Sequence, residues 1–512
     1  MTSPSLPPDM PAAARAYVNS MPAGRVELFP LTALDVTGIP CWNAIFHDAG
    51  RRSWVGVAPH GIGYGSTDAE AIVGTTGELA EAVHSAAGIW RMERRRGSFA
   101  SLARELGAEA VADPLTLCLP AGCDVDGETA LEWVPARRWP DQAVVWVPID
   151  IAACSYGDLS EGYEAFTSPI TNGLGAGPTL DFAVGHGLCE LFQRDGNGLG
   201  FRAMDRGIVL DFSGEEGGDE GPDTYPRDPR TRALLARLRG LGIDVLPKFA
   251  SDEFGLCNVY CVGDQPALGD AGAAFPLMVT AAGEAASLDR EHALRKAILE
   301  FAAARARKTF SHGPLGRVGA VAPPGYLDDY RARHTLSGEE GRTMAAMREW
   351  LGLDAGALRA RIAGSVLSRR EAQRFDALPQ WDGAMSGTGL VAELHRRLAA
   401  AGMEVLVLDW SPPGCAGVHV VKVVVPGLEV ETMSYHRIGE RGVAKLLARG
   451  SARVGFGAGP AGARAVRLPR GAAERLGGEP WLDVAEVDRV VGGLYPLYRE
   501  PEAHSAPIAM EA

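Results

Sequence analysis

The sequence predicts a mixed α/β (α+β) protein, with a single large domain built on mixed β-sheets. Amphipathic helices alternate with short apolar strands along most of the 512 residues, which is typical of this class. The composition, with 46% hydrophobic and 22% charged residues, is that of an ordinary globular protein able to bury a core.

The chain is expected to have three parts. Residues 1–34 are rich in Pro and Ala and are predicted to form a loose N-terminal arm. Residues 35–475 form the main domain, and residues 476–512 a C-terminal tail. Within the main domain, residues 325–385 have the pattern of charged helices, which indicates a helical insertion.

A repeated helix–strand–strand unit supports the predicted class. Residues 233–262 resemble residues 390–425: each segment has a helix with Leu at helical spacing, then a glycine, Gly242 or Gly402, then two short apolar strands. Glycine favours the left-handed conformation that often ends a helix. The match is too short to indicate a tandem-repeat protein.

Charge, hydropathy and cysteine usage exclude several classes of protein. The net charge is −14 and no block of basic residues occurs, which argues against nucleic-acid binding. No run reaches the roughly 18 to 20 apolar residues of a membrane span, and the first residues do not form a secretory signal. The eight cysteines lack C-x-x-C pairs, so we expect reduced thiols and a cytoplasmic protein.

The first of three acidic helices is expected over residues 66–87. Ser66 or Thr67 caps it, and Glu70 completes a capping box. Glu78 and Glu81 are three residues apart and therefore share a face. Taken alone, this face is as well explained by exposure to solvent.

The second helix contains "GHGLCELFQRDGNGLGF", residues 185–201. Glu190 lies there beside core leucines, and a carboxylate at a buried edge is costly unless it meets a cation. A glycine-rich turn, residues 168–179, precedes this helix and can bring backbone N–H groups to an anion.

The third helix, residues 289–309, places Glu300, Lys296 and Arg307 together on one side. No phosphate-binding G-x-x-x-x-G-K-[ST] motif or nucleophilic G-x-S-x-G motif occurs in the chain. Carboxylates on separate helices suit Mg²⁺, which takes oxygen ligands and shares them with phosphates. The sequence therefore indicates a magnesium and phosphate site.

These stretches resemble the motifs of the YcaO-domain family. Residues 63–82 are similar to its first motif, G-K-G-x-T followed by G-E-x-x-E-R, and residues 293–305 to its third, A-L-x-R-A-x-x-E-A-x-Q-x-R. Residues 171–195 resemble the second and most specific motif, S-N-G-x-A-A-G-N-T followed by H-G-L-x-E-x-x-E-R-D. The resemblance covers residues 35–470 in order.

The resemblance implies an enzyme that uses ATP and Mg²⁺ to activate a peptide-backbone amide. It also implies a role for each matching residue: Glu78, Glu81, Glu190 and Glu300 are metal ligands, Glu190 and Arg194 are catalytic, and Asn172, Gln193, Arg194 and Arg305 contact the nucleotide. Little covalent work would fall to the protein, because catalysis of phosphoryl transfer is mainly positioning and charge neutralisation.

Several positions depart from the family pattern: Tyr64 replaces Lys, Ala82 replaces Arg, Pro178 replaces Asn, Phe182 replaces an acidic residue, Gln193 replaces Glu, and Ala303 replaces Gln. A lost Lys removes a phosphate partner, while the Gln193 carbonyl can still coordinate a metal. A catalytically degenerate scaffold or binding subunit is therefore the alternative to an enzyme, with an ATP-using ligase of small molecules as a third hypothesis.

Among the enzymatic products, the resemblance allows an azoline, by cyclodehydration, or a thioamide. The chain ends in "EAHSAPIAMEA" rather than in a proline-rich tail, which favours the thioamide or another amide activation. The expected partners are a peptide substrate and a separate partner protein, of TfuA type or leader-binding. A homodimer is left open.

Overall fold

The computed structural model describes residues 6–7, 9–48, 59–199, 202–213, 226–267, 275–333 and 336–511. The chain folds into two compact units, each made of separate stretches of sequence. Unit 1 comprises Met1–Ala82, Gly200–Asp382 and Gly493–Ala512, and unit 2 comprises Val83–Leu199 and Gly383–Gly492. The predicted mixed α/β class is confirmed, because helices and several mixed or antiparallel sheets alternate along the chain.

Unit 1 contains two sheets, one of three strands in the order β1-β2-β3 and one of five strands in the order β11-β10-β9-β8-β12. Its strands are β1 (Gly24–Pro30), β2 (Cys41–Asp48), β3 (His60–Tyr64), β8 (Ile208–Asp211), β9 (Asp244–Ser251), β10 (Cys257–Asp264), β11 (Gly283–Ser287) and β12 (Glu371–Arg374). Its helices are α1 (Ala12–Ser20), most of α2 (Asp68–Ile89), α6 (Pro229–Gly240), α7 (Arg290–His312), α8 (Leu315–Val321), α9 (Tyr326–Arg333), α10 (Gly341–Leu351), α11 (Ala355–Ile362) and α17 (Ser505–Glu511).

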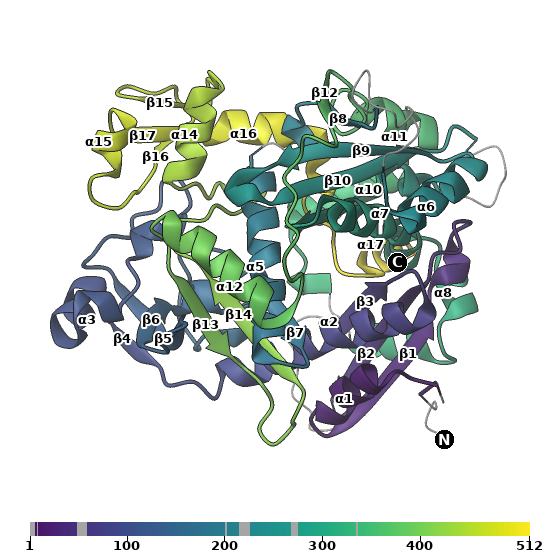
Figure 1. Ribbon diagram of the computed structural model, residues 1–512, viewed down its shortest axis with the longest axis horizontal. Helices are drawn as coiled ribbons and strands as arrows, with labels where there is room; N and C mark the ends of the chain where they lie inside the picture. The colour runs from purple at the N-terminus through teal and green to yellow at the C-terminus, as the bar shows by residue number, and fades with distance from the viewer. Residues whose placement is uncertain are drawn as a thin grey trace. The chain divides into compact units, whose positions relative to one another are not determined.

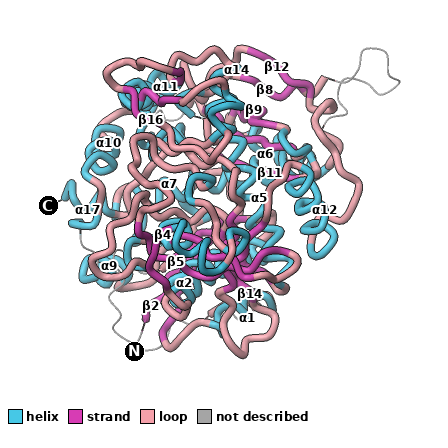
Figure 2. The backbone as a smooth tube through the Cα atoms, turned by 90° about the vertical axis from the view of Figure 1, so that its left-hand side faces the viewer, coloured by secondary structure: helices cyan, strands magenta, loops and turns pink. Residues whose placement is uncertain are grey.

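Helix α7 is the central helix of unit 1. It packs against β10 and β11 and lies beside α6 (Figure 1). Leu294, Ile298 and Phe301 are buried in the core between this helix and the five-stranded sheet, as the helical spacing predicts. At the far side of the same sheet, β12 pairs in parallel with β8, which lies next to β9 (Figure 2).

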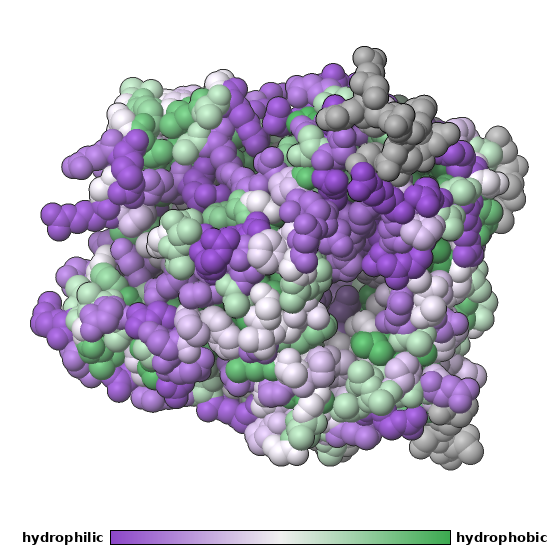
Figure 3. Space-filling model, viewed as in Figure 1, coloured by the Kyte–Doolittle hydropathy of each residue, from purple (hydrophilic) through white to green (hydrophobic). Residues whose placement is uncertain are grey.

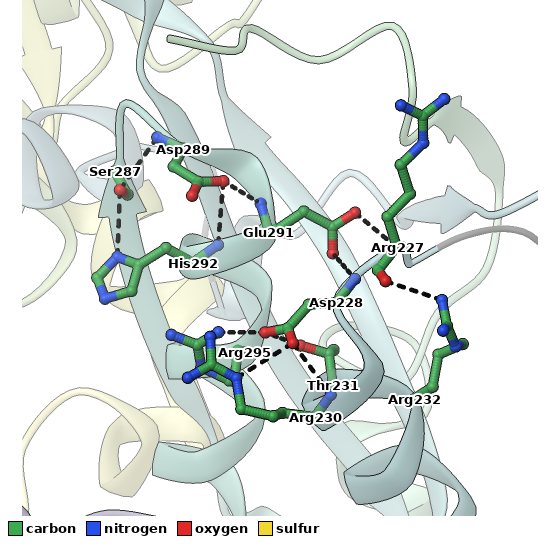
Figure 4. Close-up of polar contacts among 10 residues, drawn as sticks. All are labelled: Arg227, Asp228, Arg230, Thr231, Arg232, Ser287, Asp289, Glu291, His292 and Arg295. Carbon is green, nitrogen blue, oxygen red and sulfur yellow. Dashed lines mark hydrogen bonds and ion pairs between the residues drawn. The ribbon is translucent and has the colours of Figure 1, made fainter. Parts of the chain in front are cut away.

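Polar contacts fix the start of α7 to the start of α6 (Figure 4). Glu291 accepts hydrogen bonds from the backbone N–H groups of Arg227, at 2.7 Å, and Asp228, at 3.2 Å. Asp228 in turn caps α6 and forms an ion pair with Arg295 of α7. The two helix N-termini thus share a network of carboxylates, which satisfies N–H groups that have no partner inside a helix.

Unit 2 contains a larger sheet, in the order β4-β5-β13-β14-β7 with β6 paired to β5, and a small sheet in the order β15-β17-β16. Its strands are β4 (Arg95–Ser98), β5 (Ala130–Trp139), β6 (Val144–Pro148), β7 (Leu174–Gly177), β13 (Val405–Asp409), β14 (His419–Val424), β15 (Val454–Phe456), β16 (Ala463–Ala465) and β17 (Pro480–Asp483). Its helices are α3 (Phe99–Leu106), α4 (Ile149–Ala152), α5 (Leu180–Asn197), α12 (Gly387–Ala400), α13 (Thr432–Tyr435), α14 (Glu440–Ala448), α15 (Ala472–Leu476) and α16 (Val484–Val491).

The predicted helix–strand–strand repeat is confirmed. Helix α6 is followed by the antiparallel pair β9 and β10, and α12 by the antiparallel pair β13 and β14. Gly242 and Gly402, just after these two helices, have φ angles of 73° and 74°. This is the left-handed conformation expected of a glycine at that position.

The two ends of the chain differ from their predicted form. Residues predicted as a loose arm include α1 and β1, and β1 pairs with β2 over its whole length. The predicted tail contains β17, α16 and α17. Tertiary pairing orders these segments despite their Pro and Ala content. The predicted helical insertion does consist mainly of helices, α9 to α11, and ends in the strand β12.

The surface and the cysteines fit the sequence analysis. Hydrophilic residues predominate on the face drawn in Figure 3, with hydrophobic ones scattered among them. Among the described residues, no helix is both long and apolar enough to cross a membrane. All eight cysteines are free thiols.

Candidate functional site

Each of the three acidic helices follows a strand at the open edge of a sheet. Strand β3 leads into α2, β7 into α5 and β11 into α7, and each of these strands is the last in its sheet. An edge strand leaves backbone N–H groups without a partner strand. In each of these three strand–helix units, the helix therefore lies next to backbone groups that have no partner strand.

One glutamate on each helix accepts a hydrogen bond from a backbone N–H that lies in the edge strand or just before it. Glu78 Oε2 accepts from Ile62 N–H at 3.0 Å, and Glu300 Oε2 from Glu284 N–H at 3.1 Å, both across 16 residues. In unit 2, Glu190 Oε2 accepts from Gly173 N–H at 3.0 Å, across 17 residues. This bond partly answers why Glu190 is tolerated beside core leucines, since it stabilises the charged carboxylate.

Glycines in the edge strands make this arrangement sterically possible. A Cβ atom at Gly63, Gly175 or Gly283 would collide with the backbone of the following helix. The helix can approach the strand closely only because these side chains are absent. The glycines thus set the distance at which each glutamate reaches its backbone N–H.

In unit 1, a tyrosine links two of these strand–helix units. The Tyr64 hydroxyl, at the end of β3, donates to Glu300 Oε2 at 3.2 Å. Glu284, beside Glu300, forms an ion pair with Arg202 at 3.2 Å. Burial, and then the neighbouring Glu284, raise the pKa of Glu300, whereas burial and then Glu300 and Glu78 raise the pKa of Tyr64 well above its ordinary value. Tyr64 therefore keeps its proton and acts as a donor.

The two predicted carboxylates of α2 differ in their surroundings. Glu78 is exposed, and Glu81 is half-buried near the N-terminal helix. Burial, and then the charge of Glu81, raise the pKa of Tyr17 of α1 to about 12. Glu78 and Glu300 are linked electrostatically through Tyr64, so the structure brings these two predicted ligands together within unit 1.

In unit 2, Glu190 also interacts with Arg194, one helical turn later. Arg194 Nη2 lies 3.4 Å from Glu190 Oε1, and both side chains are half-buried. Asn172 and Gln193 are half-buried too, and Asn172 directly precedes the glycine that donates to Glu190. These four predicted residues are therefore partly accessible to a ligand.

Arg305 does not have the surroundings predicted for a nucleotide contact. Its guanidinium donates to both carboxylate oxygens of Asp35, at 2.9 and 3.1 Å, and to Gln265 Oε1 at 2.6 Å. The side chains of Arg305 and Asp35 are each only 1% exposed. Arg305 thus forms a buried ion pair that ties α7 to the segment before β2.

Three other departures from the motif pattern lie in different surroundings. Ala303 is buried in the core between α7 and the β1–β2–β3 sheet, where a longer polar side chain would need a partner. Pro178 lies just before α5 and is exposed, and Phe182 in the first turn of that helix is 40% exposed.

Sequence reasoning missed several residues of the site. Asp35, Arg202 and Glu284 are distant in sequence from the side chains that they contact, and no spacing links them. Lys422 is a further example. It lies in the core of unit 2, and the charge of Glu190, which is distant in sequence, acts on it. The sequence offers one indication of Lys422: it lies in a hydrophobic strand, and a lysine in such a strand needs buried partners.

The donor set suits a hard cation such as Mg²⁺. Both hydrogen bonds that Glu300 accepts fall on Oε2, so among the described residues nothing donates to Oε1. No three Asp, Glu, His or Cys side chains in the described part of the chain converge as a complete metal site. Mg²⁺ is usually held by one or two carboxylates together with phosphates and water, so such a complete site is not required.

Comparison with known proteins identifies the family of this chain. The chain belongs to the YcaO family, since the family model described as "YcaO cyclodehydratase, ATP-ad Mg2+-binding" matches residues 62–429. ATP and Mg²⁺, the predicted cofactors, are thus those of the family. An uncharacterised protein of Methanothermobacter thermautotrophicus is 26% identical over 419 residues, which cover 82% of this chain and 93% of that protein.

Two solved structures share the fold. The YcaO protein from Methanopyrus kandleri bound with AMPPCP and Mg²⁺ has a TM-score of 0.52 at 18% identity, over 83% of this chain and 91% of that one. A heterocyclase in complex with substrate and cofactor has a TM-score of 0.54 at 20% identity, over 82% of this chain. The match spans about half of that heterocyclase, 52% of its length.

Proposed function

We propose that this protein uses ATP and Mg²⁺ to activate a peptide-backbone amide during the biosynthesis of a modified peptide. The observation that carries the proposal is a threefold arrangement of backbone hydrogen bonds. Glu78 and Glu300 each accept from an N–H of an edge strand, and Glu190 accepts from the N–H of Gly173, just before the edge strand β7. Such bonds fix the direction of a carboxylate, as a metal ligand requires. Membership of the YcaO family supports the cofactors.

Within unit 1, Glu78 and Glu300 would hold the metal ion, with Glu81 as a further ligand. Tyr64 orients Glu300 by donating to one of its oxygens, so that the other oxygen is available. Bound ATP would supply the phosphoryl group that converts the amide oxygen into a leaving group. The protein residues then bind, orient and neutralise charge.

Within unit 2, Glu190 and Arg194 are proposed as catalytic residues, and Asn172 and Gln193 as nucleotide contacts. The Arg194 guanidinium neutralises Glu190 in the present structure and has the chemistry to bind phosphate oxygens. Gln193 would contribute its carbonyl oxygen where other family members have a carboxylate.

The nucleophile decides the product. Attack by sulfide would give a thioamide, and attack by a Cys, Ser or Thr side chain would give an azoline. We favour thioamide formation, with a peptide substrate presented by a separate partner protein of TfuA type or leader-binding, and we leave a homodimer open.

A catalytically degenerate scaffold is the second candidate. The observations that favour it are the loss of a positive charge at Tyr64 and the engagement of Arg305 in a buried ion pair. Glu190→Ala separates the two functions: catalysis is lost if the protein is an enzyme, whereas partner binding survives if the protein is a scaffold.

Titration calorimetry with ATP, with and without Mg²⁺, tests the proposal directly. We expect Mg²⁺-dependent binding that weakens by about tenfold or more in Glu78→Gln and Glu300→Gln, since even outer-shell changes cost that much. Glu105→Gln is the control, because Glu105 is an exposed residue of α3. Absence of ATP binding at millimolar concentration would contradict the enzymatic function.

A further inference from the structure

Arg307 is an exception on an otherwise buried stretch of helix. From Phe301 to His312 every residue of α7 is buried except Arg307, which is exposed. Because its side chain is exposed, Arg307 can contact a ligand, whereas the buried residues on either side of it cannot.

Arg307 follows Glu300 by two helical turns, so the two side chains share one face of α7. The charges of Glu500, Glu300 and Glu78 also act on this guanidinium. Two of them are the proposed metal ligands. Arg307 therefore lies at the unit 1 site and keeps its full positive charge.

The other two cations of this stretch are already satisfied. Arg305 is fully engaged with Asp35 and Gln265, and Lys308 forms an ion pair with Glu500. Among the described residues, no hydrogen bond or ion pair is made by Arg307 itself. Its five N–H donors, fixed in a planar fork, are thus available to an external acceptor.

We propose that Arg307 is the residue of unit 1 that contacts the phosphate groups of the bound nucleotide. This inference rests on the proposed function, because it places the nucleotide beside Glu78 and Glu300. A planar guanidinium binds two phosphate oxygens at once, and carboxylates on either side leave the phosphate within reach of their metal ion. Arg307 supplies the positive charge that Tyr64 does not.

A competing explanation is that Arg307 serves only as an internal counter-ion for Glu78 and Glu300. The two explanations predict opposite changes in the affinity for Mg²⁺·ATP when Arg307 is replaced. Removing a counter-ion would strengthen the binding of both Mg²⁺ and Mg²⁺·ATP, because the carboxylates would attract a cation more strongly. Removing a phosphate contact would weaken Mg²⁺·ATP while Mg²⁺ alone binds as well as before or better.

The experiment is titration calorimetry of wild type, Arg307→Met and Arg307→Lys with MgCl₂ alone and with Mg²⁺·ATP. Arg331→Met is the control, since Arg331 is a half-exposed arginine of α9 paired with Glu511. For Arg307→Met we expect about 10-fold to 100-fold weaker Mg²⁺·ATP binding, the range for a hydrogen-bonded charge. The Mg²⁺·ATP affinity of Arg307→Lys should lie between those of wild type and Arg307→Met, because lysine keeps the positive charge but lacks the planar guanidinium. Thermal unfolding checks that each variant folds.

Three results would overturn the inference. Tighter binding of both ligands by Arg307→Met would identify a counter-ion, and unchanged Mg²⁺·ATP binding would exclude a contact while leaving the proposed function intact. A wild-type protein that binds no ATP would refute the proposed function and this inference together.

Discussion

The hydroxyl of Tyr64 donates a hydrogen bond to Glu300 at 3.2 Å, joining the end of an edge strand to the third turn of α7. The two residues are 236 positions apart in sequence. A hydroxyl donor favours the charged form of a carboxylate, whereas burial raises the pKa of Glu300. Tyr64, a departure from the family pattern, is thus part of the site.

Tyr64→Phe should make Glu300 easier to protonate. The loss of one hydrogen bond raises the pKa of Glu300 further and lowers the free energy of unfolding by about 1 kcal/mol. Magnesium binding needs the ionised carboxylate. On acidification, the variant should therefore lose magnesium binding at a higher pH than wild type does. Titration calorimetry from pH 7 down to pH 5 measures this, with Tyr156→Phe, at an exposed tyrosine, as control. Identical pH profiles would show that the hydroxyl has no such role.

Arg305→Met should destabilise the protein without a specific effect on the nucleotide. Asp35 would be left buried without its cation, which costs about 3–5 kcal/mol. The double variant Asp35→Leu/Arg305→Met should recover much of this loss, as urea unfolding would show. If Arg305→Met instead weakened ATP binding at unchanged stability, the phosphate contact predicted from the sequence would be correct.

Glu500→Gln tests how the C-terminal segment is held on α7. Although burial opposes it, Lys308 and His312 hold the pKa of Glu500 well below its ordinary value. The stabilisation is therefore fully present above pH 4.5, the ordinary pKa of the group, and is lost as the pH falls through the lowered folded pKa.

At pH 7 we expect Glu500→Gln to lower the free energy of unfolding by about 2–3 kcal/mol, less than for a fully buried pair because Glu500 is 26% exposed. The difference from wild type should shrink at pH 3, as measured by urea unfolding. Glu511→Gln, in an exposed pair with Arg331, should change stability by less than about 0.5 kcal/mol. Equal effects of the two variants would refute the assignment.

Lys422→Met should loosen the turn that holds Asn172. The buried Lys422 Nζ donates to the carbonyl oxygens of Ala153, at 2.9 Å, and Ile170, at 2.6 Å. The variant leaves both carbonyls unsatisfied, so we expect a loss of about 2–4 kcal/mol and faster hydrogen exchange at Gly173 N–H. Lys248→Met, at a buried lysine of unit 1, should destabilise the protein without this local effect. Unchanged exchange at Gly173 would count against the idea.

His84 should make the protein sensitive to mild acid. Burial, and then Arg91, lower the pKa of His84 to about 4. Between the ordinary pKa near 6.5 and the folded value, the unfolded chain binds the extra proton, so stability falls as the pH falls across this window. His84→Gln should remove up to about 3 kcal/mol of that pH dependence. Parallel stability curves for the two proteins would contradict the prediction.

The sequence by itself determined the class of fold and the three acidic helices. Helical spacing of Leu294, Ile298 and Phe301 predicts the buried face of α7, and the structure buries all three. Capping residues located the helix starts: before α2, Glu70 N–H donates to Thr67 Oγ1, and Glu70 Oε2 accepts from the N–H of Ser66. These features are local, because periodicity and capping depend on residues a few positions apart.

Only the tertiary structure decided which charged residues are available to a ligand. Arg305 and Arg307 lie two positions apart on one helix, and a motif match favours Arg305. The fold buries Arg305 against Asp35, 270 residues away, and leaves Arg307 exposed among carboxylates. Burial and pairing of a charge depend on segments distant in sequence, which no spacing along one helix reveals. The same reason explains why the arm predicted to be loose is an ordered helix and strand.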